Sequence, residues 1–177
     1  EGSTLSVTAS AADSDLPVNA LTYSLASAPS GASINGTSGA ISWTPTEAQG
    51  PGTYSISVVV TDNGAGSLSA TQSFNVTVTE VNVVPVLAAI ANQTVAEGST
   101  LSVTASGSDT DLPANTLTYS LASAPTGASI NGTSGAISWT PTEAQGPGSF
   151  SISVVVTDNA AGSLSATQTF NVTVTEV

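Results

Sequence analysis

Carboxylates are the side chains of this chain that could do chemistry, and nothing in the sequence balances their charge. The 177 residues include 12 Asp and Glu residues but no Lys, Arg, His or Cys. Each acid of the first half recurs 96 positions later: Glu1, Asp13, Asp15, Glu47, Asp62 and Glu80 return as Glu97, Asp109, Asp111, Glu143, Asp158 and Glu176. Ca²⁺ is a hard cation that clustered carboxylates bind well. We therefore expect these acids to be calcium ligands.

The same composition argues against several function classes. With a net charge of −12, the chain is a poor partner for nucleic acid or for an anionic membrane surface, because both require Lys and Arg. Without His, Cys or Lys, the only catalytic chemistry left is that of a carboxylate pair, and no feature suggests a substrate cleft. No apolar run reaches the length of a membrane span, so this segment is not expected to insert into a membrane. We predict that the protein is not an enzyme.

The recurrence extends to the whole chain and defines two domains. Residues 1–81 and 97–177 are identical at 71 of 81 positions. We expect a first repeat at 1–81, a linker at 82–85 and a second repeat at 86–177. The first repeat has no counterpart of 82–96 and therefore lacks its first strand. Either a neighbouring chain adds a strand to the exposed edge and builds a filament, or the boundary falls inside a longer repetitive polypeptide.

Short alternating runs of apolar and polar residues, separated by Gly, Pro, Asn and Asp clusters, predict β-strands throughout. In the second repeat the strands are expected at 86–95, 100–106, 117–122, 128–131, 136–140, 149–157 and 163–175. Seven short strands of this kind are typical of an antiparallel Greek-key sandwich. The predicted fold is all-β, with two tandem seven-stranded β-sandwiches. Trp43 and Trp139 lie on strands and are expected in the cores.

The acids are expected at the two ends of each sandwich, because successive antiparallel strands deliver their loops to alternate ends. Each repeat then has three glutamates at one end (the glutamate trio) and three aspartates at the other (the aspartate trio). The glutamate trios are Glu1, Glu47 and Glu80 in the first repeat and Glu97, Glu143 and Glu176 in the second, and the aspartate trios are Asp13, Asp15 and Asp62 and Asp109, Asp111 and Asp158. If the repeats stack end to end, the first glutamate trio meets the second aspartate trio at the linker. Six carboxylates brought together would repel one another, and calcium would relieve that repulsion. The alternative is that the acids are ordinary solvated loop charges.

Several segments carry a family resemblance: Ala96-Glu97-Gly98, the Asp-x-Asp loop 108–113, Thr142-Glu143-Ala144, Val156-Thr157-Asp158 and the linker segment 78–82. They resemble the calcium-binding segments of cadherin-like repeats, particularly the bacterial and dystroglycan-type repeats of large surface adhesins. The resemblance implies calcium between successive repeats, with the backbone carbonyls of Val81 and Asn115 and the side chain of Asn82 as further ligands. The linker departs from the family by having Val83 where an Asp is common, which favours one or two ions per joint.

Two functions follow from these observations. The first is an extracellular, cell-surface array of repeats that calcium makes rigid and that serves as the stalk or filament of a bacterial adhesin. Its partners would be neighbouring repeats of the same array and further copies of the chain. The alternative is a carbohydrate-binding module for extracellular polysaccharide, although aromatic residues make up only 5% of the chain.

Overall fold

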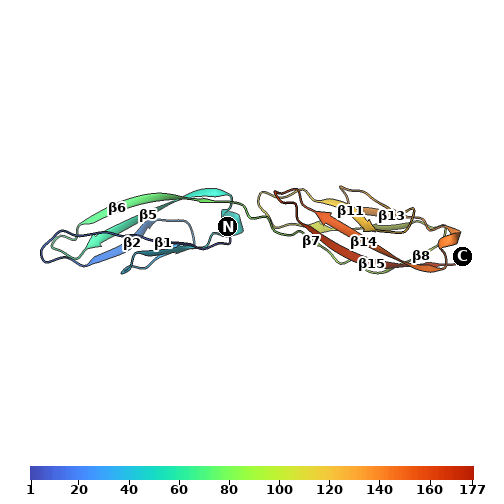
Figure 1. Cartoon of the computed structure of the whole chain (residues 1–177), viewed down its shortest axis with the longest axis horizontal. Helices are drawn as coiled ribbons and strands as arrows, with labels where there is room; N and C mark the ends of the chain where they lie inside the picture. Colours follow the sequence, from blue (N-terminus) through green and yellow to red (C-terminus); the bar gives the residue numbers. More distant parts are fainter. The chain divides into compact units, whose positions relative to one another are not determined.

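The computed structural model describes residues 1–177, which form two compact units, Glu1–Val81 and Asn82–Val177. In each unit the strands run along its length and the loops gather at its two ends (Figure 1). No helix in the structure is long and apolar enough to cross a membrane. The predicted all-β fold of tandem sandwiches is confirmed.

Unit 1 packs two three-stranded sheets against each other. One sheet has the order β1-β4-β3, and the other has the order β2-β5-β6. All strand pairs in this unit are antiparallel. The elements are β1 (Leu5–Thr8), β2 (Leu21–Ser27), β3 (Ser33–Ile34), β4 (Ala40–Trp43), the 3-10 helix η1 (Glu47–Gln49), β5 (Gly52–Asp62) and β6 (Ser69–Val78).

Unit 2 repeats this arrangement and extends it. Its sheets have the orders β12-β13-β9 and β11-β14-β15-β8, and a separate two-stranded sheet joins β10 to β7. The elements are β7 (Val86–Leu87), β8 (Gln93–Ala96), β9 (Leu101–Thr104), β10 (Gly107–Ser108), β11 (Thr118–Ser123), β12 (Ser129–Ile130), β13 (Ala136–Trp139), the 3-10 helix η2 (Glu143–Gln145), β14 (Gly148–Thr157) and β15 (Ser165–Thr175). Strand β8 is the one parallel neighbour in the molecule, running alongside β15.

The first strand of unit 2 differs from the single run predicted at 86–95. It is two short strands, because the chain pairs with β10 at Val86–Leu87 and then crosses to the other sheet, where 93–96 pairs with β15. The crossing residues 88–92 leave the ladder. The segment 86–96 therefore pairs with two different sheets, the two-stranded sheet of β10 and β7 and the four-stranded sheet that contains β15.

Alternation places one face of each strand in the core. In β14, Ile152, Val154 and Val156 are fully buried, as the period-2 pattern predicts. Both tryptophans are 1% exposed, so the prediction that they lie in the cores is confirmed. Each indole meets an aromatic ring edge-on at 5.1 Å, Tyr54 in unit 1 and Phe150 in unit 2. Burial in the core leaves neither indole as a stacking surface for sugars.

Candidate calcium sites

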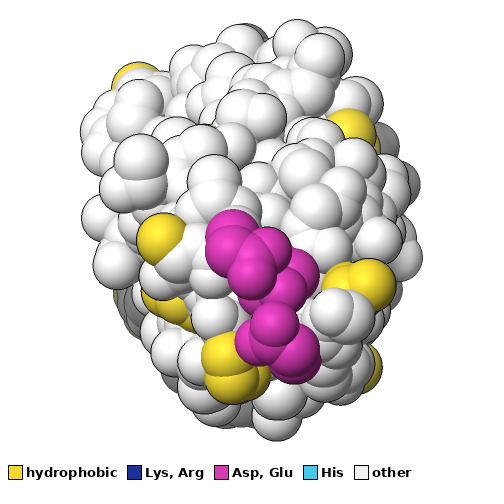
Figure 2. Space-filling model, turned by 90° about the vertical axis from the view of Figure 1, so that its right-hand side faces the viewer, with side chains coloured by type: hydrophobic (Ala, Val, Ile, Leu, Met, Phe, Trp, Pro, Cys, Tyr) yellow, Lys and Arg dark blue, Asp and Glu magenta, His cyan; other side chains and the backbone are white.

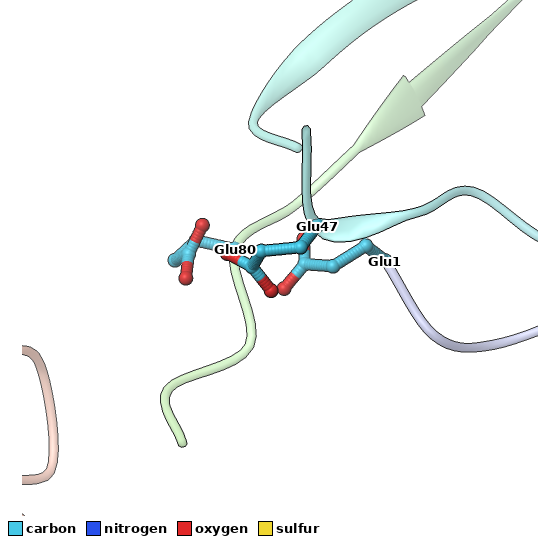
Figure 3. Close-up of side chains that lie close together, drawn as sticks. All are labelled: Glu1, Glu47 and Glu80. Carbon is cyan, nitrogen blue, oxygen red and sulfur yellow. The ribbon is translucent and has the colours of Figure 1, made fainter. Parts of the chain in front are cut away.

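A trio of glutamates gathers at one end of each unit. In unit 1 these are Glu1, Glu47 and Glu80, and in unit 2 they are Glu97, Glu143 and Glu176. Within each trio, one carboxylate oxygen from each residue lies within 4.8 Å of the others. Figure 3 shows the unit 1 side chains arriving from three separate segments, and Figure 2 shows the acidic side chains at the end of unit 2 forming one continuous patch. The predicted gathering of three glutamates per unit is thus observed.

Each glutamate of the unit 1 trio is positioned by a different element of the fold. Glu1 precedes β1, Glu80 follows β6, and Glu47 is the first residue of the short helix η1. At the start of η1 the backbone N–H of Thr46 donates to the side-chain oxygen of Gln49 at 3.0 Å, which closes the turn that carries Glu47. The equivalent bond in unit 2, from Thr142 to Gln145, is 2.9 Å. The glutamates are therefore held by backbone geometry.

A glycine makes room for one carboxylate of each trio. A Cβ atom at Gly50 would collide with the Oε2 atom of Glu1, and one at Gly146 would collide with that of Glu97. Both glycines have extended backbones, so what glycine contributes here is space for the carboxylate in its observed position and not a positive φ. Sequence reasoning missed this role, because a Gly-Pro pair in a loop is ordinarily interpreted as a turn.

Glu97 shows the electrostatic strain of the cluster. Its side chain is 7% exposed, and its Oε2 atom is buried without a hydrogen-bond partner. Burial raises the pKa of Glu97 above its ordinary value of 4.5, and the charges of Glu143 and Glu176 raise it further, against a lowering by the hydrogen bond from the Val177 backbone. A buried, unpaired carboxylate oxygen is costly unless a proton or a cation compensates it.

The raised pKa of Glu97 predicts how stability depends on pH in calcium-free solution. Because the folded state binds this proton more tightly than the unfolded chain does, the contribution of Glu97 is fully favourable below pH 4.5 and is lost as the pH rises through the raised pKa. Glu97→Gln removes this titration while keeping the shape of the side chain. In urea unfolding with a chelator, we expect Glu97→Gln to gain stability relative to wild type on going from pH 5 to pH 7. A constant difference across this range would contradict the assignment.

The donor set fits a calcium ion. Ligand oxygens lie about 2.4 Å from Ca²⁺, so two oxygens bound to one ion are at most about 4.8 Å apart. Both glutamate trios meet this limit. Oxygens buried without partners also occur at Glu1 Oε2, Asn82 Oδ1 and Asp109 Oδ2, all on residues that the sequence nominated as ligands. Buried polar atoms normally have partners, and a bound cation would supply them.

The other end of unit 2 is organised by the residues that lead into it. The side-chain amide of Asn82 donates to both oxygens of Asp158 at 3.3 and 3.4 Å. The backbone N–H of Val83 donates to both oxygens of Asp111 at 3.1 and 3.2 Å. Asp111 and Asp158 are 2% and 3% exposed. Because the Asn82 amide nitrogen faces Asp158, its unpaired Oδ1 oxygen remains free for an ion.

The aspartate trios are less tightly drawn together than the glutamate trios. Asp109, Asp111 and Asp158 do not bring three carboxylate oxygens within 4.8 Å, and neither do Asp13, Asp15 and Asp62 in unit 1. Several of these carboxylates instead accept backbone N–H groups within their own loops. Asp13 accepts from Asp15 at 2.8 Å and Asp109 from Asp111 at 3.0 Å, and Asp62 and Asp158 accept from Leu68 and Leu164. The alternation of loops between the two ends of a sandwich predicts that the three aspartates of a unit lie at the same end, but it does not predict these hydrogen bonds.

Two further nominated residues make contacts that their expected roles did not include. Asn115, expected to offer its backbone carbonyl, donates its side-chain amide to Asp111 at 2.7 Å. The backbone N–H of Val81, whose carbonyl was the expected ligand, donates to Glu1 at 2.6 Å. Both bonds orient a carboxylate. Sequence reasoning also missed that the backbone N–H of Val83 binds Asp111, since a backbone N–H leaves no signature in a sequence.

Comparison with known families identifies the modules. The family model He_PIG, described as "Putative Ig domain", matches residues 1–79 and again residues 84–175. The chain belongs to this family. No curated protein sequence matches the chain. The He_PIG repeats thus cover the sequence almost end to end.

Solved structures give the He_PIG pair the fold of cadherin extracellular repeats. The chain is similar to a protocadherin γB7 EC3-6 cis-dimer structure at 21% identity, with a TM-score of 0.60, over 91% of this chain and 42% of that one. It is similar to mouse cadherin-23 EC22-24 at 23% identity, with a TM-score of 0.59, over 89% and 53%. The chain thus spans about half the length of these structures. The cadherin-like resemblance is confirmed as a resemblance of fold.

Proposed function

We propose that this tandem of He_PIG domains is part of an extracellular, cell-surface repeat array that calcium makes rigid. Its role is that of a stalk or filament in a bacterial adhesin. The observation that carries the proposal is the set of buried, unpartnered oxygens on Glu1, Asn82, Glu97 and Asp109 in a chain without any Lys, Arg or His. Cadherin-like folds support an adhesive, structural role.

Calcium is proposed to bind where one repeat continues into the next. Glu80 belongs to the glutamate trio of unit 1 and Asn82 is bonded to Asp158 of unit 2, and only Val81 separates them along the chain. The proposed ligands are the glutamate trio of unit 1 together with Val81, Asn82, Asp109, Asp111, Asn115 and Asp158. The aspartate trio of unit 1 and the glutamate trio of unit 2 would bind calcium in the same way at joints with further repeats. When bound, calcium supplies positive charge and cross-links segments that otherwise repel, which stiffens the array.

A calorimetric calcium titration with matched variants tests this assignment. Asp111→Asn removes a proposed ligand, and Asp15→Asn makes the same change at the equivalent position of unit 1. We expect Asp111→Asn to weaken the tightest calcium site by tenfold or more, about 1.4 kcal/mol. Asp15→Asn should leave that site intact. Absence of calcium binding at millimolar concentration, or equal losses in both variants, would refute the proposal.

Rigidity is a separate readout from binding. Small-angle scattering of the chain with calcium should show a narrower distribution of dimensions than scattering with a chelator. The same measurement on Asp111→Asn should resemble the chelated sample. If calcium binds but the dimensions do not respond, the stiffening role is wrong even though the site exists.

A further inference from the structure

Three asparagine–glycine pairs occur in the chain, at Asn35-Gly36, Asn63-Gly64 and Asn131-Gly132. An asparagine before glycine is open to intramolecular attack, because glycine has no Cβ to hinder the approach of its backbone nitrogen to the asparagine side chain. The first and third pairs are equivalent positions of the two repeats. They lie in the hairpin turns between β3 and β4 and between β12 and β13. The structure gives the three pairs different surroundings.

The hairpin turn of unit 1 folds the side chain of Asn35 back over the chain that follows it. Its Oδ1 oxygen accepts the backbone N–H of Thr37 at 3.0 Å and that of Ser38 at 2.9 Å. A hydrogen bond to the residue two positions ahead is an Asx-turn, and it closes a ring that contains both the side-chain Cγ atom and the nitrogen of Gly36. This ring holds the Cγ atom and the nitrogen close together.

The backbone around Gly36 is fixed, but its own N–H group is not bonded. The carbonyl oxygen of Asn35 accepts from Gly39 at 2.9 Å, and that of Gly36 accepts from Tyr23 at 2.8 Å. The Gly36 N–H donates no hydrogen bond within the chain. Asn35 and Gly36 are both exposed, so a base in the solvent can reach the proton on this nitrogen.

The two donors to Oδ1 lie where negative charge would develop. When the Gly36 nitrogen attacks the Cγ atom of Asn35, the carbonyl electrons move onto Oδ1. Backbone N–H donors about 2.7–3.1 Å from such an oxygen stabilise its charge, and both donors lie in this range. Unit 2 repeats the arrangement, because Asn131 accepts from Thr133 at 3.0 Å and from Ser134 at 2.9 Å.

The third pair lacks both features. The backbone N–H of Gly64 donates to the Oδ1 atom of Asp62 at 2.9 Å, so its nitrogen would have to lose a proton beside a carboxylate. The Oδ1 atom of Asn63 accepts one N–H, from Ala20 at 2.8 Å, and none from the residues that follow it. Its side chain is therefore held away from the turn, and Asn63 serves as an internal control.

We propose that the turns at Asn35 and Asn131 are modification sites at which the fold promotes its own deamidation. The deprotonated nitrogen of the following glycine forms a bond to the side-chain Cγ atom. The bond between Cγ and Nδ2 then breaks, and Nδ2 takes up a proton from solvent and leaves as ammonia. Water opens the resulting succinimide ring at either carbonyl, which yields aspartate or isoaspartate. No atom is oxidised or reduced in these steps.

The two products have different effects on the hairpin. Aspartate keeps a side-chain oxygen for the N–H groups of Thr37 and Ser38, so the turn is preserved. Isoaspartate routes the backbone through the side chain and lengthens it by one carbon, which disturbs the pairing of Ile34 with Ile41. Either product adds one negative charge to a chain that already carries −12. The charge of a repeat array would therefore increase with its age.

Incubation of the full chain at mildly alkaline pH tests the proposal. Peptide mapping by mass spectrometry follows the replacement of NH2 by OH at each asparagine, and fragments that include Ser30 or Thr126 distinguish the two turns. An isoaspartyl methyltransferase with labelled S-adenosylmethionine counts the isoaspartate. A synthetic peptide of residues 31–41, whose sequence recurs at 127–137, is the unfolded reference.

We expect Asn35 and Asn131 in the folded chain to react about tenfold faster than the peptide and about tenfold faster than Asn63. Each factor corresponds to about 1.4 kcal/mol in activation free energy. These two rates should be the same in calcium and in chelator, because the turns contain none of the proposed calcium ligands. Rates at Asn35 and Asn131 no faster than in the peptide would overturn the proposal, as would a rate at Asn63 equal to theirs.

Gly36→Ala is the matched variant. A Cβ at this position would lie 3.4 Å from the Tyr23 carbonyl oxygen, which is an ordinary contact, and Gly36 has no positive φ. The turn therefore accommodates alanine, whose methyl group hinders the approach of the nitrogen. Deamidation at Asn35 should fall by about tenfold or more, while Asn131 in the same chain keeps its rate. An unchanged rate at Asn35 would contradict attack by this nitrogen.

Discussion

Removing calcium with a chelator is expected to lower the midpoint of thermal unfolding of this chain by about 10–20 °C. An ion at about 100 times its Kd stabilises the folded state by about 2.7 kcal/mol. For a domain of about 60–100 residues, the size of each unit of this chain, 1 kcal/mol shifts the midpoint by about 4–8 °C. Without calcium the glutamate trios keep three carboxylates within 4.8 Å of one another, with no Lys or Arg in the chain to offset them. Calorimetric scans in millimolar calcium chloride and in chelator measure the difference.

The controls separate calcium from ionic strength and from general destabilisation. Magnesium demands near-octahedral geometry and sheds water reluctantly, so at equal concentration it should restore little of the lost stability. Glu47→Gln keeps the side-chain size and removes one charge of the unit 1 trio. This variant should reduce the calcium-dependent shift while raising the midpoint measured in chelator. Identical midpoints with and without calcium would contradict the proposed sites.

Much of the fold could be predicted because local pattern and tertiary environment agree. The alternation in 149–157 correctly predicted a strand there, and Ile152, Val154 and Val156 on one of its faces are core residues. Strand parity correctly gathered three glutamates in each unit. These predictions depend only on the two-residue period of a strand and on the alternation of loops between the two ends of a sandwich.

The parts that could not be predicted depend on contacts between distant segments. The break in 86–95 arises because its first half pairs with β10 and its second half with β15, and no local signal marks the crossing. The aspartates could be assigned to one end, but their backbone hydrogen bonds depend on loop conformations. The space that Gly146 leaves for Glu97 is likewise visible only in three dimensions.

Phe170→Ala is expected to destabilise unit 2 by about 3–5 kcal/mol, the usual cost of truncating a buried phenylalanine. Phe170 is 1% exposed and belongs to the continuous core of unit 2. The matched change in unit 1, Phe74→Ala, should cost about half as much, because Phe74 is only half-buried and lines the open groove. The sequences around both positions are nearly identical, so propensity effects cancel in the comparison.

The measurement is hydrogen exchange under increasing urea, read by mass spectrometry. The equivalent positions Ser73 and Thr169 differ in mass, so a peptide fragment that spans one of them can be assigned to its unit. Unit 1 of the wild-type chain should open at lower urea than unit 2, since its core lacks the cover of Leu87 and Val95. Adding the 82–96 sequence before Glu1 should bring the cost of Phe74→Ala up toward that of Phe170→Ala, because the same side chain would then be buried. Equal costs in the chain without this addition would contradict the prediction, because they would mean that residues 82–96 leave the energetics of the core unchanged.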